Sequence, residues 1–553
     1  MPTWLNDACF YEIYPQTFCD SNGDGIGDIQ GIIQKLDYIR DTGFNALWIN
    51  PCFDSPFKDA GYDVRDYKKV APRYGSNEDL IQLFQEAHRR GIHVLLDLVP
   101  GHTSEEHEWF LESKKAEENA FSDRYVWTNF GFQGAKDFKY VAGESDRDGA
   151  YILNFFNCQP ALNYGFGRQD EKWMMAPDSP AAIGTREAMK DVMKFWMDLG
   201  CDGFRVDMAS SLVKNDTEDK KYTQAIWQNV RGWLDQNYPE AAIVSEWGYG
   251  FQAFDAGFHM DFTLNDPGCG YTSLFRDYSN PRGDRDWVLL ESKKETAKLY
   301  KEHASHDPEK PWREDCLTQD HSYFRKDGHG DITTFLADYE GRYAAARGKG
   351  YISLITGNHD TPRINFTLDD TERRLSFAFI YTMPGVPFMY YGDEIGMKYR
   401  YLPSKEGGFQ RTGSRTPMQW TGGKNLGFSE ASEDALYLPV EDEKDAPNVE
   451  SQLAEEGSLL HFVKDLLKLR HENRDLQADG SFEVLHGESR DPLFVYRRGD
   501  LICAVNPSGD ERSFDLSKRD AKALCGEEIF SYGETGYDAG RLTLGGQSFL
   551  VLK

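Results

Sequence analysis

The sequence alternates short apolar runs rich in β-branched residues with amphipathic stretches, and this repeat constrains the fold more than any other feature. The apolar runs are residues 46–50, 92–99, 203–207, 241–246, 351–356 and 387–391. Amphipathic stretches such as 80–90 and 188–199 lie between them. Buried parallel strands form continuous apolar runs, and a helix usually connects one such strand to the next. We therefore predict an α/β fold, a (β/α)8 TIM barrel, with a doubly wound sheet as the weaker alternative.

Two parts of the chain do not follow this repeat. About a hundred residues separate Val99 from the next strand near Gly203, far more than a usual strand-to-helix connection. We expect an inserted subdomain there, at residues 103–175, after strand 3. Beyond residue 470, short apolar segments predict a C-terminal antiparallel β-sandwich at 471–553. The barrel would then comprise residues 1–102 and 176–470.

Charge and composition exclude several classes of partner. The formal net charge of −29 disfavours nucleic acids and anionic membrane surfaces. The chain has no apolar run of about 18 residues, so we expect no membrane span. Its nine cysteines are an odd number without C-x-x-C pairs, and its first residues lack the features of a signal peptide. We expect a cytoplasmic protein with a neutral small-molecule ligand.

Polar side chains stand at or just beyond the ends of four predicted strands. In a TIM barrel such positions face the catalytic mouth. One acid after a strand is more often a loop cap, but several converging acids favour catalysis. Glycoside hydrolysis needs two carboxyl groups around the anomeric carbon and donors that bind the sugar hydroxyls. The candidates are Asp97, His102, Arg205, Asp207, Glu246, His359 and Asp360.

Four short segments at these strand ends resemble the signature regions of the α-amylase family, glycoside hydrolase family 13. The segments are residues 97–102, 203–207, 245–246 and 357–360. Three others, 11–18, 385–394 and 414–420, are similar to the α-glucosidase and oligo-1,6-glucosidase branch. The resemblance covers nearly the whole chain. It implies a small-molecule α-glucoside as the substrate.

The resemblance also implies a retaining mechanism. Asp207 would be the nucleophile, Glu246 the general acid/base, and Asp360 would hold the sugar 2- and 3-hydroxyls. Retention requires the two catalytic carboxyls to be about 5 to 5.5 Å apart. The residues agree with these roles, since Arg205 can favour ionised Asp207 and burial can raise the pKa of Glu246.

Further residues are expected to shape a sugar pocket. His102 and His359 would donate hydrogen bonds to hydroxyls of the same glucosyl ring, beside Asp97. By resemblance, Tyr62 would stack on the glucose face. A charged wall of Asp59 and Arg415 would close the far end of the pocket. The last feature predicts exo action on short substrates.

Residues 20–28 alternate oxygen-bearing side chains with glycines, as in a calcium loop. The loop lacks the bidentate Glu at its twelfth position. In the branch that it resembles, the ligands of a structural Ca²⁺ would be Asp20, Asn22, Asp24, the Ile26 carbonyl and Asp28. Mg²⁺ in the same loop is an alternative.

Three positions depart from the family pattern. Gly101 replaces the Asn that usually precedes His102, which removes a ligand of an amylase-type second calcium site. Ala161 stands where segment 159–163 commonly has an acid. Met208 follows the nucleophile, where Val is typical of α-1,6-specific members and Ala or Thr of α-1,4-specific members. Linkage preference therefore stays open.

Three functional hypotheses follow. The first is hydrolysis of short α-glucosides. The second is glucosyl transfer or isomerisation, as in trehalose synthases and sucrose isomerases, although residues 361–366 lack an arginine-rich isomerase-type loop. The third is a non-catalytic interaction module, which the retained carboxylates disfavour. The natural disaccharide and the number of subunits are not predicted.

Overall fold

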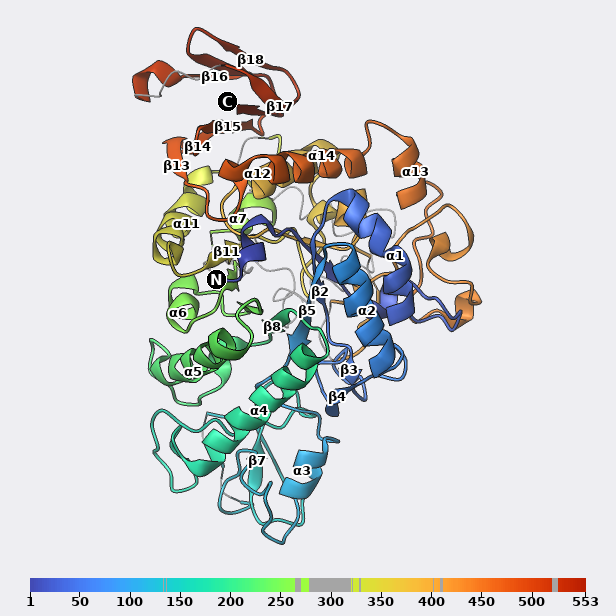
Figure 1. Cartoon of the computed structure of the whole chain (residues 1–553), viewed down its shortest axis with the longest axis vertical. Coiled ribbons are helices and arrows are strands. Elements are labelled where there is room, and N and C mark those ends of the chain that lie inside the picture. The colour runs from blue at the N-terminus through green and yellow to red at the C-terminus, as the bar shows by residue number, and fades with distance from the viewer. Residues whose placement is uncertain are drawn as a thin grey trace, which may run out of the picture.

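Eight parallel strands form the centre of the molecule in this computed structural model (Figure 1). It describes residues 1–553 except 133, 136, 264–269, 278–319, 321, 328–329, 401, 408–410 and 520–525. Part of the predicted barrel range therefore lies outside the described residues. The strands are β1 (Phe10–Ile13), β2 (Ala46–Ile49), β5 (His93–Leu98), β8 (Gly203–Val206), β9 (Ala242–Ser245), β10 (Met260–Phe262), β11 (Tyr351–Ser353) and β12 (Phe388–Tyr390). Their order in the sheet is β11-β10-β9-β8-β5-β2-β1-β12.

Backbone hydrogen bonds between β11 and β12 bring the two edges of this sheet together. Val386 N–H donates to Ile352 O at 3.0 Å, and Phe388 N–H donates to Leu354 O at 2.9 Å. The predicted TIM barrel is thus confirmed. Because the strands are parallel, the residues that follow each of them emerge on one face.

Helices surround the barrel and cover its apolar strands. They are α1 (Ile29–Thr42), α2 (Asn77–Arg89), α4 (Pro180–Asp198), α5 (Lys221–Asn237), α6 (Gly250–Asp255), α7 (Thr272–Phe275), α11 (Ile332–Ala346), α12 (Asp370–Thr382), α13 (Val449–Ala454) and α14 (Leu459–Glu472). Local sequence sets their ends: Ser76 and Asp79 form a capping box at α2, and Gly43 ends α1 with φ of 115°.

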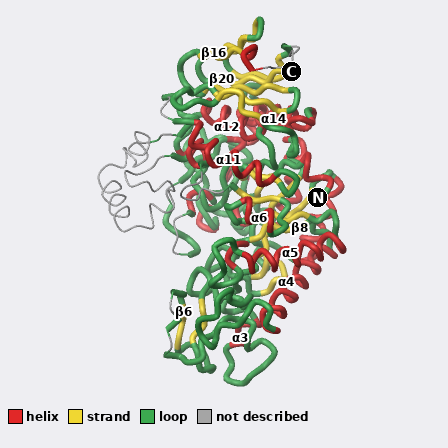
Figure 2. Tube along the Cα trace, turned by 90° about the vertical axis from the view of Figure 1, so that its left-hand side faces the viewer, coloured by secondary structure: helices red, strands yellow, loops and turns green. Residues whose placement is uncertain are grey.

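The inserted segment between β5 and α4 lies at one end of the molecule in both views (Figures 1 and 2). It contains α3 (Glu108–Ser113) and the hairpin β6 (Tyr140–Ala142) and β7 (Ala150–Ile152). Its small core includes Ile152, Phe166 and Trp173. An antiparallel bridge joins His102 of the barrel to Ala161 of the segment. A second hairpin, β3 (Phe53–Asp54) and β4 (Asp66–Val70), lies between β2 and α2.

Two antiparallel sheets form the C-terminal part at the other end of the molecule (Figure 2). One sheet has the order β13-β14-β15-β20-β17 and the other β16-β19-β18. Leu542 and Leu544 of the smaller sheet share a core with Val495, Ile502 and Leu550 of the larger one. The predicted sandwich is therefore present. Its strands are β13 (Glu483–His486), β14 (Phe494–Arg498), β15 (Leu501–Asn506), β16 (Arg512–Asp515), β17 (Glu528–Tyr532), β18 (Thr535–Asp538), β19 (Arg541–Leu544) and β20 (Ser548–Leu552).

The described residues bear on two predictions, the absence of a membrane span and the presence of reduced cysteines. Within them, no helix has the length and apolarity needed to cross a bilayer. Six cysteines of this part of the chain are free thiols, and five of the six are buried.

Candidate active site

Arg205 lies at the centre of the acidic cluster at the strand ends. Its guanidinium bonds Asp207 Oδ1 at 2.9 Å and Glu246 Oε2 at 2.7 Å. It also bonds Asp97 Oδ1 at 2.9 Å. Arg205 comes from β8, whereas Asp97 lies in β5 and Glu246 follows β9. Three neighbouring strands therefore bring three carboxyl groups to one buried cation.

Burial favours the neutral forms of the two predicted catalytic acids, but to different extents. It raises the pKa of Glu246 to about 8, against the opposing effect of Arg205. Burial also raises the pKa of Asp207, and the charge of Arg205 again opposes this. The Glu246 side chain keeps 23% of its surface exposed, and that of Asp207 keeps 10%. Asp207 therefore ionises before Glu246 as the pH rises.

Asp97 is a buried anchor beneath these groups. Its Oδ2 accepts hydrogen bonds from Trp48 Nε1 and from the Tyr62 hydroxyl, both at 3.1 Å. Together with Arg205, these donors leave no part of its side chain exposed. Asp97 consequently holds Arg205 and Tyr62 in place and has no surface left for a ligand.

His359 lies against Tyr62, and its two ring nitrogens have partners on opposite sides. The two rings are stacked, with centroids 5.4 Å apart. Nε2 lies 2.7 Å from the Tyr62 hydroxyl and 3.3 Å from Asp360 Oδ2. Nδ1 lies 3.0 Å from Glu12 Oε1 and 3.1 Å from Asn50 Nδ2. Glu12 and Asn50 belong to the site, and the sequence analysis missed them.

Asp360 is held by two arginines. Its Oδ1 lies 2.8 Å from Arg411 Nη1 and 2.6 Å from Arg415 Nη2. Burial alone would raise the pKa of Asp360, but Arg411, His359 and Arg415 together hold it well below the usual range. Asp360 is thus an anion at every physiological pH.

The cation that pairs with Asp59 is Arg411, which corrects the expected Asp59–Arg415 wall. Arg411 bonds both Asp59 and Asp360. Arg415 follows the short helix Thr412–Ser414, and its guanidinium bonds Asp360 Oδ1 at 2.6 Å and the His359 carbonyl at 2.8 Å instead of Asp59. The two arginines are four residues apart in one polar segment, and this spacing could have indicated a shared site.

The inserted segment also contacts this charged wall. Gln159 Nε2 donates to Asp59 Oδ2 at 2.7 Å. His102 is 1% exposed, with Nδ1 3.0 Å from Asn154 Nδ2 and Nε2 3.2 Å from the Tyr62 carbonyl. Both nitrogens of His102 therefore have protein partners, so its predicted bond to a sugar hydroxyl would require an exchange of partners.

The oxygen-bearing side chains of the predicted metal loop already accept hydrogen bonds from the loop itself. Its donors are hard oxygens, which suit Ca²⁺. Asp20 accepts hydrogen bonds from the backbone of Asn22, Gly23 and Gly25, at 2.7 to 3.1 Å. Asp28 accepts from Ser21 and caps α1 through Gly31 N–H. Within the described residues, no three His, Cys, Asp or Glu side chains converge as metal ligands. The metal stays a prediction.

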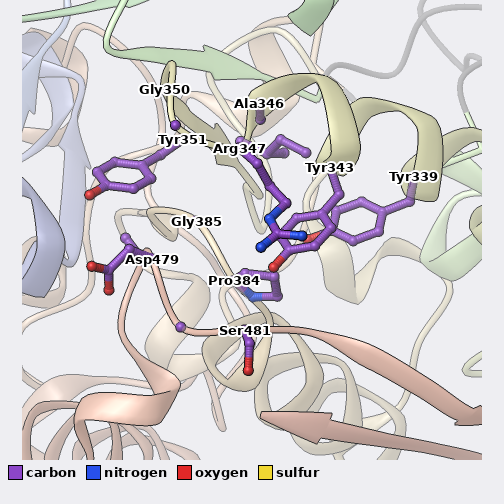
Figure 3. Close-up of a pocket in the computed structure, with 14 residues that line it drawn as sticks. Tyr339, Tyr343, Ala346, Arg347, Gly350, Tyr351, Pro384, Gly385, Asp479 and Ser481 are labelled. Carbon is purple, nitrogen blue, oxygen red and sulfur yellow. The ribbon is translucent and has the colours of Figure 1, made fainter. Parts of the chain in front are cut away.

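A separate cavity of about 260 Å³ lies where β11 begins and just before β12 (Figure 3). It is lined by Tyr343 of α11, by Arg347 directly after that helix, by Tyr351 at the start of β11 and by Asp479. None of the predicted site residues lines it. In a TIM barrel, chemistry belongs to the other face, where the strands end.

A TIM barrel with three carboxyl groups around one buried arginine at its strand ends, and a charged wall beside them, is typical of enzymes that act on glycosides. The α-amylase catalytic domain profile matches residues 12–479. The chain belongs to the α-amylase family, glycoside hydrolase family 13, and is a glycoside hydrolase of the α-glucosidase type.

Relatives of known activity match over almost the full length. A trehalose synthase/amylase of Mycolicibacterium smegmatis is 32% identical and covers 96% of this chain and 88% of its own. An oligo-1,6-glucosidase of Heyndrickxia coagulans is 31% identical and covers 97% of both. A crystal structure of a trehalulose synthase from Pseudomonas mesoacidophila is similar in fold, with TM-score 0.76, 22% identity and full coverage of both chains.

Proposed function

We propose that the chain is a retaining, exo-acting α-glucosidase that hydrolyses short α-glucosides through a covalent glucosyl-enzyme. One observation carries this proposal: a single guanidinium, that of Arg205, bonds both Asp207 and Glu246. A retaining glycosidase needs an ionised nucleophile close to a protonated acid. The shared guanidinium holds the two carboxyl groups close together and favours ionised Asp207, whereas burial raises the pKa of Glu246 to about 8 and so favours its protonated form.

The proposed reaction has two steps. Asp207 attacks the anomeric carbon while Glu246 gives its proton to the leaving oxygen, forming a β-glucosyl ester. Glu246, now ionised, takes a proton from water as the water attacks that ester. Asp360, fixed as an anion by Arg411 and Arg415, binds the sugar hydroxyls as charge develops on the ring.

The exo preference rests on the wall formed by Asp59 and Arg411. Asp59 is 3% exposed and Arg411 is 5% exposed, so the pair fills the space beside Asp360. We infer that a glucosyl chain cannot extend past this wall. Isomalto- or malto-oligosaccharides and related disaccharides would enter with the non-reducing end first. The buried free thiols favour a reducing compartment, and we propose the cytoplasm.

A second candidate, a glucosyl-transferring or isomerising enzyme, is favoured by the similarity to trehalose synthases. Such an enzyme forms the same glucosyl-enzyme but transfers the glucosyl group to a sugar hydroxyl instead of to water. The two candidates differ in how well the pocket retains the leaving sugar.

A panel of linkage-defined disaccharides separates the two candidates. We expect glucose to accumulate from at least one of them, with a rate reduced at least about 10⁴-fold in Asp207→Ala. Asp235→Ala, an exposed acid on α5, serves as the matched control and should act like the wild type. An isomeric disaccharide with little glucose would establish the second candidate, and no product from any sugar would refute both.

A further inference from the structure

Gly101, in the first signature region, has the side chain of Asn154 packed against its Cα. A Cβ atom at Gly101 would lie 2.8 Å from Asn154 Nδ2. Heavy atoms do not pack that closely without a shift of one of them. Asn154, two residues after β7 in the inserted segment, therefore occupies the space that a side chain at position 101 would need.

The amide of Asn154 has a defined orientation. Lys214 Nζ donates to Asn154 Oδ1 at 2.6 Å and to the Ser211 carbonyl at 2.9 Å. An ammonium group only donates, so the oxygen of the amide must face Lys214. The nitrogen of the amide consequently faces His102, 3.0 Å from its Nδ1, and Met208, 3.8 Å from its sulfur.

This orientation selects one tautomer of His102. Burial lowers the pKa of His102 to about 3, so the ring is neutral at neutral pH. Because Asn154 donates to Nδ1, the proton of the ring resides on Nε2 and is donated to the Tyr62 carbonyl at 3.2 Å. Lys214, Asn154 and His102 thus form one hydrogen-bonded chain that ends at Tyr62.

Met208 connects the same amide to the proposed acid. Its backbone has φ of 42°, and its N–H donates to Glu246 Oε2 at 3.0 Å. A non-glycine residue with positive φ is held there by its surroundings. Asn154 contacts the side chain of Met208, the residue whose backbone N–H bonds Glu246.

We propose that Asn154, oriented by Lys214, is a positioning residue for His102 and, through Met208, for the acid Glu246 of this active site. It supplies from the inserted segment the amide that Gly101 lacks, fixes His102 and holds Met208 against Glu246. This inference rests on the proposed function of Glu246. It assigns to the inserted segment a direct influence on which leaving group is protonated well.

The test compares Asn154→Ala, Gly101→Asn and the double variant on a disaccharide and on an activated aryl α-glucoside. Loss of positioning lowers kcat/KM by about tenfold on the disaccharide, whose leaving group needs a proton, and less on the aryl glucoside. Gly101→Asn alone collides with Asn154. In the double variant the collision is gone, and an amide is restored from position 101.

The proposal requires both results: a double variant more active on the disaccharide than either single variant, and a smaller loss on the aryl glucoside for Asn154→Ala. A double variant no better than the singles, or equal losses on both substrates, overturns it. If Gly101→Asn does not fold, Asn154→Asp takes its place. This change keeps the acceptor for Lys214 but cannot donate to His102, so activity like the wild type would overturn the proposal.

Asn119→Ala is the matched control, because the Asn119 amide in the same segment bonds the backbone of Glu112, Glu117 and Phe121. We expect it to match the wild type on both substrates. The wild type is assayed first. If it cleaves no glucoside, the proposed function fails, whereas cleavage without the expected variant pattern refutes only the positioning role.

Discussion

Asp207 and Glu246 share one cation, Arg205, yet their carboxyl groups differ in pKa. Both bond Arg205, but burial raises the pKa of Glu246 to about 8 and that of Asp207 only to about 6. Two carboxyl groups with separated pKa values can divide the roles of acid and nucleophile at one pH. The division follows from the environment of each side chain.

The pH dependence of kcat/KM should show this division. Activity should fall above a pH of about 8, as Glu246 loses its proton. It should also fall on the acid side, at a pH above the usual Asp range, as Asp207 becomes protonated. Because Asp207 and Glu246 interact, the two apparent pKa values of the profile describe the pair and not the separate residues. A profile flat to well above pH 8 would contradict the assignment of Glu246 as the acid, and initial rates with a disaccharide measure it.

Arg411 should be as important as the expected Arg415. Arg411→Ala leaves the buried Asp59 without its cation and takes one of two arginines from Asp360, and such truncations cost roughly 3 kcal/mol, about a hundredfold in kcat/KM. Arg168→Ala, at an exposed ion pair of the inserted segment, is the control. Steady-state kinetics and thermal unfolding of both variants test this. An Arg411→Ala enzyme with normal kcat/KM would show that the wall does not bind substrate.

Three site residues were not predicted from the sequence, and the physical reason is the same for each. Glu12, Arg411 and Lys214 act through contacts with residues distant in the chain. The spacing of Arg411 and Arg415 indicated a shared site at most, and no local pattern names the distant partner of any of the three. The strand-end acids were predictable because a parallel strand fixes the face on which its last residues lie. The partner of Asp59 was not predictable, because the short helix Thr412–Ser414 determines whether Arg411 or Arg415 reaches Asp59.

At the scale of elements, the loop 20–28 joins β1 to α1 through the cap formed by Asp28. A hard cation bound there would stabilise the start of α1. At a hundredfold excess over its dissociation constant, Ca²⁺ would add about 2.7 kcal/mol to the free energy of unfolding. We predict that EGTA lowers the midpoint of thermal unfolding and that Ca²⁺ restores it.

Asp24→Ala should abolish this response, because Asp24 is a predicted ligand that lies outside the acidic cluster. Asp41→Ala, an exposed acid at the end of α1, is the control and should keep it. An unfolding midpoint that does not respond to Ca²⁺ or Mg²⁺ in the wild type would contradict a structural metal in this loop. Differential scanning calorimetry distinguishes these outcomes.

At the scale of the whole molecule, the barrel and both added parts were predictable from the sequence. Parallel strands need continuous apolar runs, and a connection of about a hundred residues is too long to be a loop. What the sequence could not show is how the inserted segment joins the site. The bridge between Ala161 and His102 holds that segment against the barrel. Gln159 of the segment then bonds Asp59, and Asn154 bonds His102.

The central claim is that Asp207 forms a covalent bond to the anomeric carbon. A fluorinated α-glucosyl fluoride, which forms the glucosyl-enzyme faster than water removes it, tests this most directly when combined with peptide mapping by mass spectrometry. We predict one glucosyl-type adduct per chain, located on Asp207 and absent from Asp207→Ala. An adduct on another residue, or turnover of the reagent with inversion and no adduct, would contradict the account.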